Sequence, residues 1–135
     1  MCEVFVSANP ESYESRTRSV RLHGVITSIR LENLHWEVLE EIAARDGMSV
    51  VQLIEKLHDE LVQARGAVGN FASFLRVSAL RYMALLAHQR IPANLEVPIA
   101  SLDARTVLRG LPAHWAHGSA GGRPARLHLD EASAD

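Results

Sequence analysis

The sequence predicts a mainly α-helical fold in which one short β-strand precedes two helices and a C-terminal helical extension follows them. Apolar and polar residues alternate in "ITSIRL" (26–31), which indicates the strand. Apolar residues then recur at helical spacing on both sides of a Gly-containing turn, which indicates the two helices. At 135 residues with 5% aromatic residues, the chain suits one small domain with a core mostly of Leu, Ile, Val and Ala.

The strand is expected within an extended segment over 19–31, with Gly24 as a bend or bulge in a single longer strand. Because strand side chains alternate, one face carries Thr27, Ile29 and Leu31, and the other carries Ile26, Ser28 and Arg30. A single strand with one buried face is unstable in water, and we identify no second strand in the chain to pair with it. We therefore expect it to pair with the same strand of a second chain, as an antiparallel ribbon about a two-fold axis.

The first helix is predicted over 33–46 and ends at Gly47, a residue type that readily adopts the left-handed conformation after a helix. The second helix opens at Ser49, where "SVVQ" forms a capping box with Gln52. The apolar stripes of the two helices consist of Trp36, Leu39, Ile42 and Ala43, and of Leu53, Ile54, Leu57 and Leu61. Leu34 and Val38 widen the first stripe, so this helix is expected to be covered on more than one side.

A third helix is predicted after Asn70, which would cap it, and Pro92 prevents its continuation. Its stretch "FASFLRVSALRYMALLAHQ" is too apolar to be left in water, so it either thickens the dimer core, forms tetramers or holds a protein partner. A short fourth helix is expected between Ser101, as its cap, and Gly110. The resulting layout is a mobile N-terminal arm (1–15), a strand and two helices (16–66), a helical extension (67–112) and a disordered tail (113–135).

Charge distribution is more informative than the net charge of -2. The segment 15–30 contains Arg16, Arg18, Arg21 and Arg30 and no acidic residue. This basic segment is either an anion-binding edge or a solvated arm, and charge alone does not separate the two. One cysteine, Cys2, excludes an intrachain disulfide, and neither a signal peptide nor a membrane-spanning apolar run is evident, so a soluble, cytoplasmic protein without a membrane partner is expected.

The sequence predicts no metal site, no cofactor and no enzyme activity. The seven histidines are His23, His35, His58, His88, His114, His117 and His128. They form no H-x-H or H-E-x-x-H spacing, and the chain has no nucleophile elbow, Gly-rich phosphate loop or dinucleotide fingerprint.

The stretch "ITSIRLENLHWEVLEEIAARDGMSVVQLIEKL" (26–57) resembles a ribbon-helix-helix domain of the Arc/MetJ type. The resemblance covers roughly residues 20–61 and consists of the alternating strand, the helix, the Gly-containing turn and the Ser-capped second helix. It implies a homodimer that lays an antiparallel two-stranded ribbon in the major groove of double-stranded DNA. Assembly of several dimers on DNA is a further possibility that the resemblance leaves open.

The resemblance also implies roles for particular residues. Base edges would be read by Ile26, Ser28 and Arg30, since a guanidinium can bond both acceptors of a guanine edge. Phosphates would be held at the start of the second helix by Ser49, Val50 and Val51. Just before the ribbon, Arg16, Arg18 and Arg21 would contact either the DNA backbone or an adjacent minor groove. Ser49 acting only as a helix cap is the structural alternative. His23 is expected either to contact DNA or the partner chain, or to pack structurally.

Two residues depart from the family pattern. Ile26 stands where a polar residue is usual, which implies either contact with a thymine methyl or a ribbon register shifted by one residue. Thr27 is less apolar than the family norm for the inward face. The sequence thus indicates a homodimeric DNA-binding transcriptional regulator, and the alternative is an adaptor or antitoxin-like module that binds a protein through 67–112.

Overall fold

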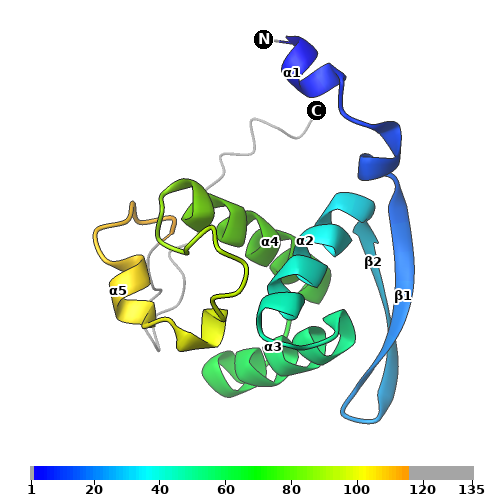
Figure 1. Ribbon diagram of the computed structural model, residues 1–135. Coiled ribbons are helices and arrows are strands. Elements are labelled where there is room, and N and C mark those ends of the chain that lie inside the picture. Colours follow the sequence, from blue (N-terminus) through cyan, green and yellow to red (C-terminus); the bar gives the residue numbers. More distant parts are fainter. Residues whose placement is uncertain (1, 116–135) are drawn as a thin grey trace, which may run out of the picture.

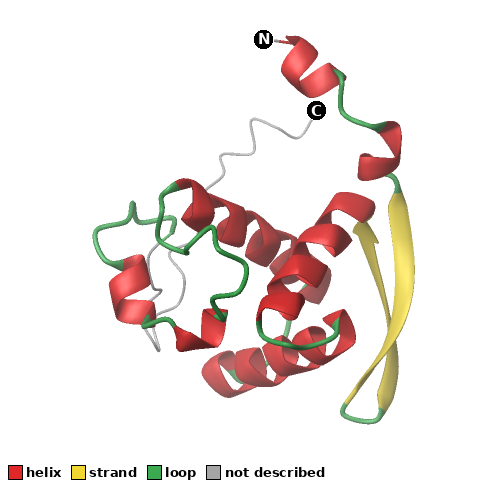
Figure 2. Cartoon of the chain, viewed as in Figure 1, coloured by secondary structure: helices red, strands yellow, loops and turns green. Residues whose placement is uncertain are grey.

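The computed structural model describes residues 2–115 and combines one β-hairpin with a group of helices. The elements are α1 (Cys2–Val6), the 3-10 helix η1 (Pro10–Tyr13), β1 (Ser15–Leu22), β2 (Val25–Glu32), α2 (Asn33–Arg45), α3 (Val50–Arg65), α4 (Phe71–Ala87), the 3-10 helix η2 (Ile99–Ser101) and α5 (Ala104–Leu108). The hairpin lies along one side of α2, α3 and α4, and α5 lies on the opposite side (Figure 1). Helices make up most of the described chain (Figure 2). Most of the tail predicted to be disordered, 116–135, lies outside the described residues.

The strand before α2 has a partner in its own chain, so the prediction of one bent strand without an internal partner was wrong. β1 and β2 pair antiparallel from Ser15↔Glu32 to Leu22↔Val25. The turn consists of His23 and Gly24, whose φ angles of 50° and 80° are both positive. Positive φ at both central residues is the requirement of the two-residue turn that matches strand twist, so Gly24 reverses the chain instead of bending a single strand.

The two faces predicted for the strand are confirmed. Ile29 and Leu31 of β2 are buried together with Val20 and Leu22 of β1, whereas Ser28 is exposed. All four buried side chains belong to one core cluster with Trp36 and Leu39 of α2 and with Leu53 and Ile54 of α3. The hairpin therefore covers the helix pair with one face and turns the other face outward.

The predicted end of α2 and the predicted start of α3 are confirmed. Gly47 has a φ of 68°, and the Met48 N–H donates to the Ala43 carbonyl across the end of α2. At the start of α3, the Gln52 N–H donates to the Ser49 hydroxyl (3.2 Å) and the Ser49 N–H donates to the Gln52 side chain (2.9 Å). Both halves of the capping box are thus formed.

α4 is part of the core and not an appended helix. Asn70 caps it as predicted, accepting from the Ser73 N–H at 3.1 Å. Leu75 and Ala79 join the core cluster of the hairpin, while Tyr82 and Leu85 form a second cluster with Ile91. Val38 and Ile42 of α2 pack against both clusters, which confirms that α2 is covered on more than one side.

The short helix near the C-terminal end begins later than predicted. Its cap is Asp103, which accepts from the Arg105 N–H at 3.3 Å, whereas Ser101 ends η2. The carboxylate of Asp103 also accepts from the Thr106 hydroxyl at 2.9 Å, so it satisfies two donors of the first turn. Gly110 follows α5 with a φ of 70°, as expected for a residue that ends a helix.

The N-terminal arm is joined to the fold only near its end. α1 has no buried residue and stands apart from the other helices (Figure 1). Asn33, the first residue of α2, donates from its N–H to the Glu14 carbonyl (2.8 Å) and from its side chain to the Glu11 carbonyl (2.9 Å). These bonds fix the segment that enters β1, and mobility of the preceding residues stays a prediction.

Candidate nucleic-acid interface

The outer face of the hairpin consists of three cross-strand pairs. These pairs are Thr17↔Arg30, Ser19↔Ser28 and Arg21↔Ile26. All six residues are exposed and none of them is acidic. The three residues predicted to read bases thus lie side by side on β2, and β1 adds a row that the sequence analysis did not assign to this face.

Ile26 lies on the outer face in line with Ser28 and Arg30. It is 67% exposed, while Ile29 and Leu31 are buried on the other face. The alternation is therefore not shifted by one residue in this hairpin. An exposed isoleucine beside Arg21 gives the outer face one apolar contact position near the turn.

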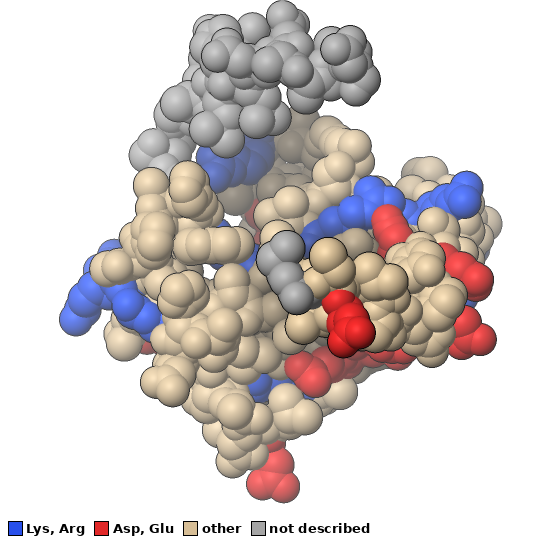
Figure 3. Space-filling view, turned by 90° about the horizontal axis from the view of Figure 1, so that it is seen from above, with Lys and Arg blue, Asp and Glu red and all other residues tan. Residues whose placement is uncertain are grey.

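Arg16 and Arg18 lie on the side of β1 that faces the helices, away from Arg21. The Arg18 guanidinium lies 4.9 Å from the centre of the Trp36 ring, and its Nη2 donates to Glu40 Oε1 at 2.7 Å. Arg16 Nη2 lies 3.9 Å from the same oxygen. On the side where Figure 1 places the hairpin, Lys and Arg side chains border Asp and Glu side chains in the view of Figure 3. Of the three arginines before the turn, only Arg21 is on the outer face.

The N-terminus of α3 offers backbone donors of the kind that bind a phosphate. The first N–H groups of a helix have no intrahelical acceptor, and at α3 these include Val50 and Val51. Ser49 and Gln52 satisfy each other, and the first turn contains no acidic residue. No carboxylate in the first turn therefore neutralises the positive end of the helix dipole.

Arg76 connects α4 to the end of β2 that carries Arg30. Its Nε lies 3.1 and 3.2 Å from the two carboxylate oxygens of Glu32, and its Nη2 donates to the Arg30 carbonyl at 3.2 Å. Desolvation raises the pKa of Glu32, but the hydrogen bond and charge of Arg76 lower it. The backbone of Glu32 and the charge of His35 lower it further, and the net result is a pKa below the ordinary value of 4.5. Arg76 thus ties the C-terminal end of β2 to α4 and keeps the Glu32 carboxylate ionised.

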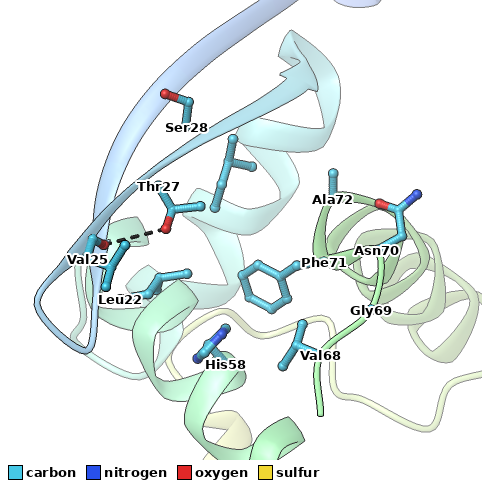
Figure 4. A pocket seen from close by; sticks show the side chains of 11 residues that line it. Leu22, Val25, Thr27, Ser28, His58, Val68, Gly69, Asn70, Phe71 and Ala72 are labelled. Atoms are coloured by element: carbon cyan, nitrogen blue, oxygen red, sulfur yellow. Dashed lines mark hydrogen bonds between the residues drawn. The ribbon is translucent and has the colours of Figure 1, made fainter.

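An apolar groove runs along β2 on the side of α4. β2 lines it with Val25, Thr27, Ser28 and Ile29, and the opposite wall is the segment 68–72. The Phe71 ring points into the space between the strand and α4 (Figure 4). Within residues 2–115, β1 is the only strand that pairs with β2, so the second edge of β2 has no strand partner there.

Thr17 and Ser19 are site candidates that the sequence analysis missed. The signal was present as alternation in "SRTRSVRL" followed by the His-Gly dipeptide. Two consecutive extended segments separated by two residues with Gly second predict a hairpin. The high charge of the first segment obscured the pattern.

Comparison with known proteins agrees with this architecture. A family model described as a ribbon-helix-helix domain matches residues 15–83, which include both strands and most of α4. A solved structure of an uncharacterised protein from Bordetella pertussis Tohama I is 64% identical, with a TM-score of 0.85 over 92% of this chain and 96% of that one. No curated protein gives a significant match. In the described part of the chain, none of the helices has the length and apolar character needed to span a membrane.

Proposed function

The chain belongs to the ribbon-helix-helix family, and we propose that it is a homodimeric, sequence-specific DNA-binding protein that acts as a transcriptional regulator in the cytoplasm. The observation that carries this proposal is the outer face of the hairpin. A two-stranded β-ribbon fits the major groove of B-DNA, and this ribbon presents hydroxyls and guanidinium groups without a carboxylate. No catalytic step is part of the proposal.

Arg30 and Ser28 are the proposed base-reading residues, with Ile26 as an apolar contact for a thymine methyl. Arg30 can donate two hydrogen bonds to the acceptors of a guanine edge, and Ser28 can donate or accept. Thr17 and Ser19 lie directly opposite Arg30 and Ser28, so they extend the same reading surface onto β1.

Phosphate contacts are proposed for Ser49, Val50 and Val51 at the N-terminus of α3, and for Arg21. Arg16 and Arg18 remain candidates for the DNA backbone only if Glu40 releases them, because both guanidinium groups lie near that carboxylate. Their contribution should therefore be smaller than that of Arg21.

The dimer is proposed to form about a two-fold axis, as is general for this family. The second edge of β2 lacks a strand partner in residues 2–115, so β2 of a second copy could pair there. The two β2 strands would then form the central two-stranded ribbon, with one β1 strand on each side of it. A symmetric dimer predicts a palindromic DNA site, whereas one hairpin acting alone predicts a site without two-fold symmetry.

Selection of bound sequences from a random DNA pool near physiological salt tests both the DNA binding and the two-fold symmetry of the dimer. Enrichment of a short palindrome supports a dimer that reads DNA, and sedimentation velocity on the same sample should give twice the chain mass of 14.9 kDa. Affinity should fall steeply as salt rises, because bound phosphates release counterions. No enrichment of any sequence would contradict the proposed function.

Arg30→Ala tests the assigned face of the hairpin. Its binding energy for the selected site should fall by about 1–3 kcal/mol, with relaxed preference at one position, in a fluorescence-polarisation titration. The matched control is Arg105→Ala, which removes the same charge from exposed α5 on the side away from the hairpin (Figure 1). Equal affinities for the two variants would contradict a base-reading role of Arg30.

A second candidate function is binding of a protein partner through the C-terminal helices. α4 exposes Val77, Leu80 and Met83 in one line at a spacing of three residues. A groove between α2 and α4, lined by Leu34, Met83, Leu86 and Leu95 among others, continues this apolar surface. Such a surface suits a partner helix or a second dimer on DNA, and both roles are compatible with DNA reading by the hairpin.

A further inference from the structure

Three potential metal ligands from two distant parts of the sequence meet beside the hairpin turn. His23 lies in the turn between β1 and β2, and His58 and Asp59 are adjacent on α3. One ligand atom from each residue lies within 4.8 Å of the others. His23 Nε2 is 2.6 Å from Asp59 Oδ1, and the two imidazole ring centres are 5.4 Å apart.

The geometry of the turn determines the position of His23. Its φ of 50° is uncommon for a residue other than Gly, although Asn, Asp and His adopt such values more often than other residues do. The paired strands impose this conformation, because the following Gly24 also has a positive φ and the two residues close the hairpin. The imidazole is thereby directed toward α3, where it reaches Asp59.

His58 is the partly buried member of the cluster. Its ring packs edge-on against Phe71, with ring centres 5.2 Å apart. Figure 4 shows it on α3 close to Leu22 and Val68. Its Nδ1 is buried and has no hydrogen-bond partner among the described residues. An unpartnered buried nitrogen is costly unless a ligand satisfies it, so this imidazole has an unused coordination or hydrogen-bonding position.

We propose that His23, His58 and Asp59 bind a first-row transition-metal ion, with Zn²⁺ as the preferred ion. Two imidazoles and one carboxylate suit Zn²⁺ and leave a fourth, tetrahedral position for water. Imidazole ligands disfavour Mg²⁺ and Ca²⁺, which take oxygen ligands. Glu55 lines the adjoining hollow with Asp59 and adds negative charge, which Arg21 on the same hollow partly offsets.

Binding at this position would join the hairpin turn to α3. The two histidines are 35 positions apart, and the turn otherwise meets α3 through the exposed His23–Asp59 pair. An ion held by both elements would stabilise the folded chain by mass action and restrain the tip of the hairpin. Metal binding at this site does not depend on DNA reading and can be measured without DNA.

The test uses the full chain after removal of metal by chelation, titrated with Zn²⁺ in a calorimeter and melted with and without Zn²⁺. The expected result is one Zn²⁺ per chain and a raised Tm, with no effect of Mg²⁺. Co²⁺ bound in place of Zn²⁺ should give visible absorption bands of a four-coordinate site. Zn²⁺ affinity should fall in His23→Asn, His58→Gln and Asp59→Asn by at least the roughly 10- to 100-fold that loss of an outer-shell partner of a metal ligand costs.

Each variant is chosen to keep the fold. Asn accepts positive φ and replaces only the imidazole in the turn, and Asp59→Asn is nearly isosteric. The matched control, His88→Asn, removes an exposed histidine at the C-terminal end of α4 and should bind Zn²⁺ as the parent does. Equal Zn²⁺ affinity of the parent and a variant in which His23, His58 and Asp59 are all replaced would overturn the proposal. So would the absence of Zn²⁺ binding to the parent, which would leave a histidine–carboxylate pair only.

Discussion

Arg45 connects the last turn of α2 to a loop that follows α4. Its side chain is 5% exposed and donates to the Val97 carbonyl (3.0 and 2.9 Å), the Asn94 carbonyl (3.1 Å) and the Tyr82 hydroxyl (3.2 Å). The Tyr82 hydroxyl donates onward to Glu41 at 2.6 Å. Burial and the bond to Glu41 raise the pKa of Tyr82 above 10, against the opposing charge of Arg45.

Arg45→Met should lower the free energy of unfolding by about 1–3 kcal/mol, because it leaves the buried Tyr82 hydroxyl and the part-buried carbonyls of Asn94 and Val97 without the Arg45 donors while keeping most of the side-chain volume. Urea denaturation measures the change. Arg65→Met, at an exposed position in the last turn of α3, should change stability by less than about 0.5 kcal/mol. Similar losses for both variants would show that the Arg45 bonds contribute little.

At the scale of a single element, the N-terminus of α3 allows capping and phosphate binding to be separated. Asp caps a helix about as well as Ser, so Ser49→Asp should retain the thermal stability of the parent. The added carboxylate should repel a phosphate at the N–H groups of Val50 and Val51, and DNA affinity should fall by roughly tenfold, about 1.4 kcal/mol.

Ser49→Thr is the control for this experiment, since it keeps both the cap and the neutral hydroxyl. It should match the parent in melting temperature and in DNA affinity. Unchanged DNA binding by Ser49→Asp, with its cap intact, would mean that Ser49 serves the helix alone.

The contact between β2 and α4 predicts a pH dependence of stability. Arg76 holds the pKa of Glu32 below 4.5 in the folded state. The Glu32–Arg76 pair therefore stabilises the folded chain above about pH 4.5, and this stabilisation is lost as pH falls through the lower folded-state pKa. The pair is partly exposed, so its value near neutral pH should be only about 0.2–1 kcal/mol. Arg76→Gln should unfold at a lower urea concentration than the parent at pH 7, and this difference should shrink as pH falls below about 4.5. An equal difference in stability between Arg76→Gln and the parent above and below this pH would contradict an ionised Glu32 as the partner of Arg76.

The elements that the sequence predicted correctly are those that local chemistry specifies. Gly47 and the Ser49–Gln52 capping box mark the boundary between α2 and α3 within a few residues. The hairpin was missed because His23 occupies a turn position where Asn or Asp gives the stronger signal. Arg18 was assigned to DNA because nothing local shows that it stacks on Trp36 of another element.

At the scale of the whole molecule, the sequence could not bring together residues that only the folded chain makes neighbours. The histidines follow no metal-binding spacing, yet the hairpin places His23 beside His58 and Asp59. The same holds for Leu75 and Ala79, which make α4 part of the hairpin's core. Removing the chain after α3 would therefore expose that core, so point substitutions are the better test of α4.

Leu80→Lys tests the exposed apolar surface of α4 that consists of Val77, Leu80 and Met83. Leu80 is 58% exposed, so the change should alter stability by less than about 0.5 kcal/mol. If this surface joins dimers on DNA, sedimentation velocity should show loss of the larger complexes on a site with two half-sites placed in tandem. Ala87→Lys adds the same charge at another exposed position of α4 and should assemble as the parent does. Equal assembly by both variants would exclude this surface as the contact.

The pairing of β1 with β2 has a consequence for how sequence preference can change over evolution. In a ribbon built from two copies of one strand, a single codon change alters two places at once. Here the two strands of the hairpin are different segments of one chain, so a mutation at Thr17 leaves its cross-strand partner Arg30 unchanged, although in the proposed homodimer it occurs once in each protomer. Each half of a cross-strand pair can therefore diverge independently, and new specificities can arise through one-sided steps.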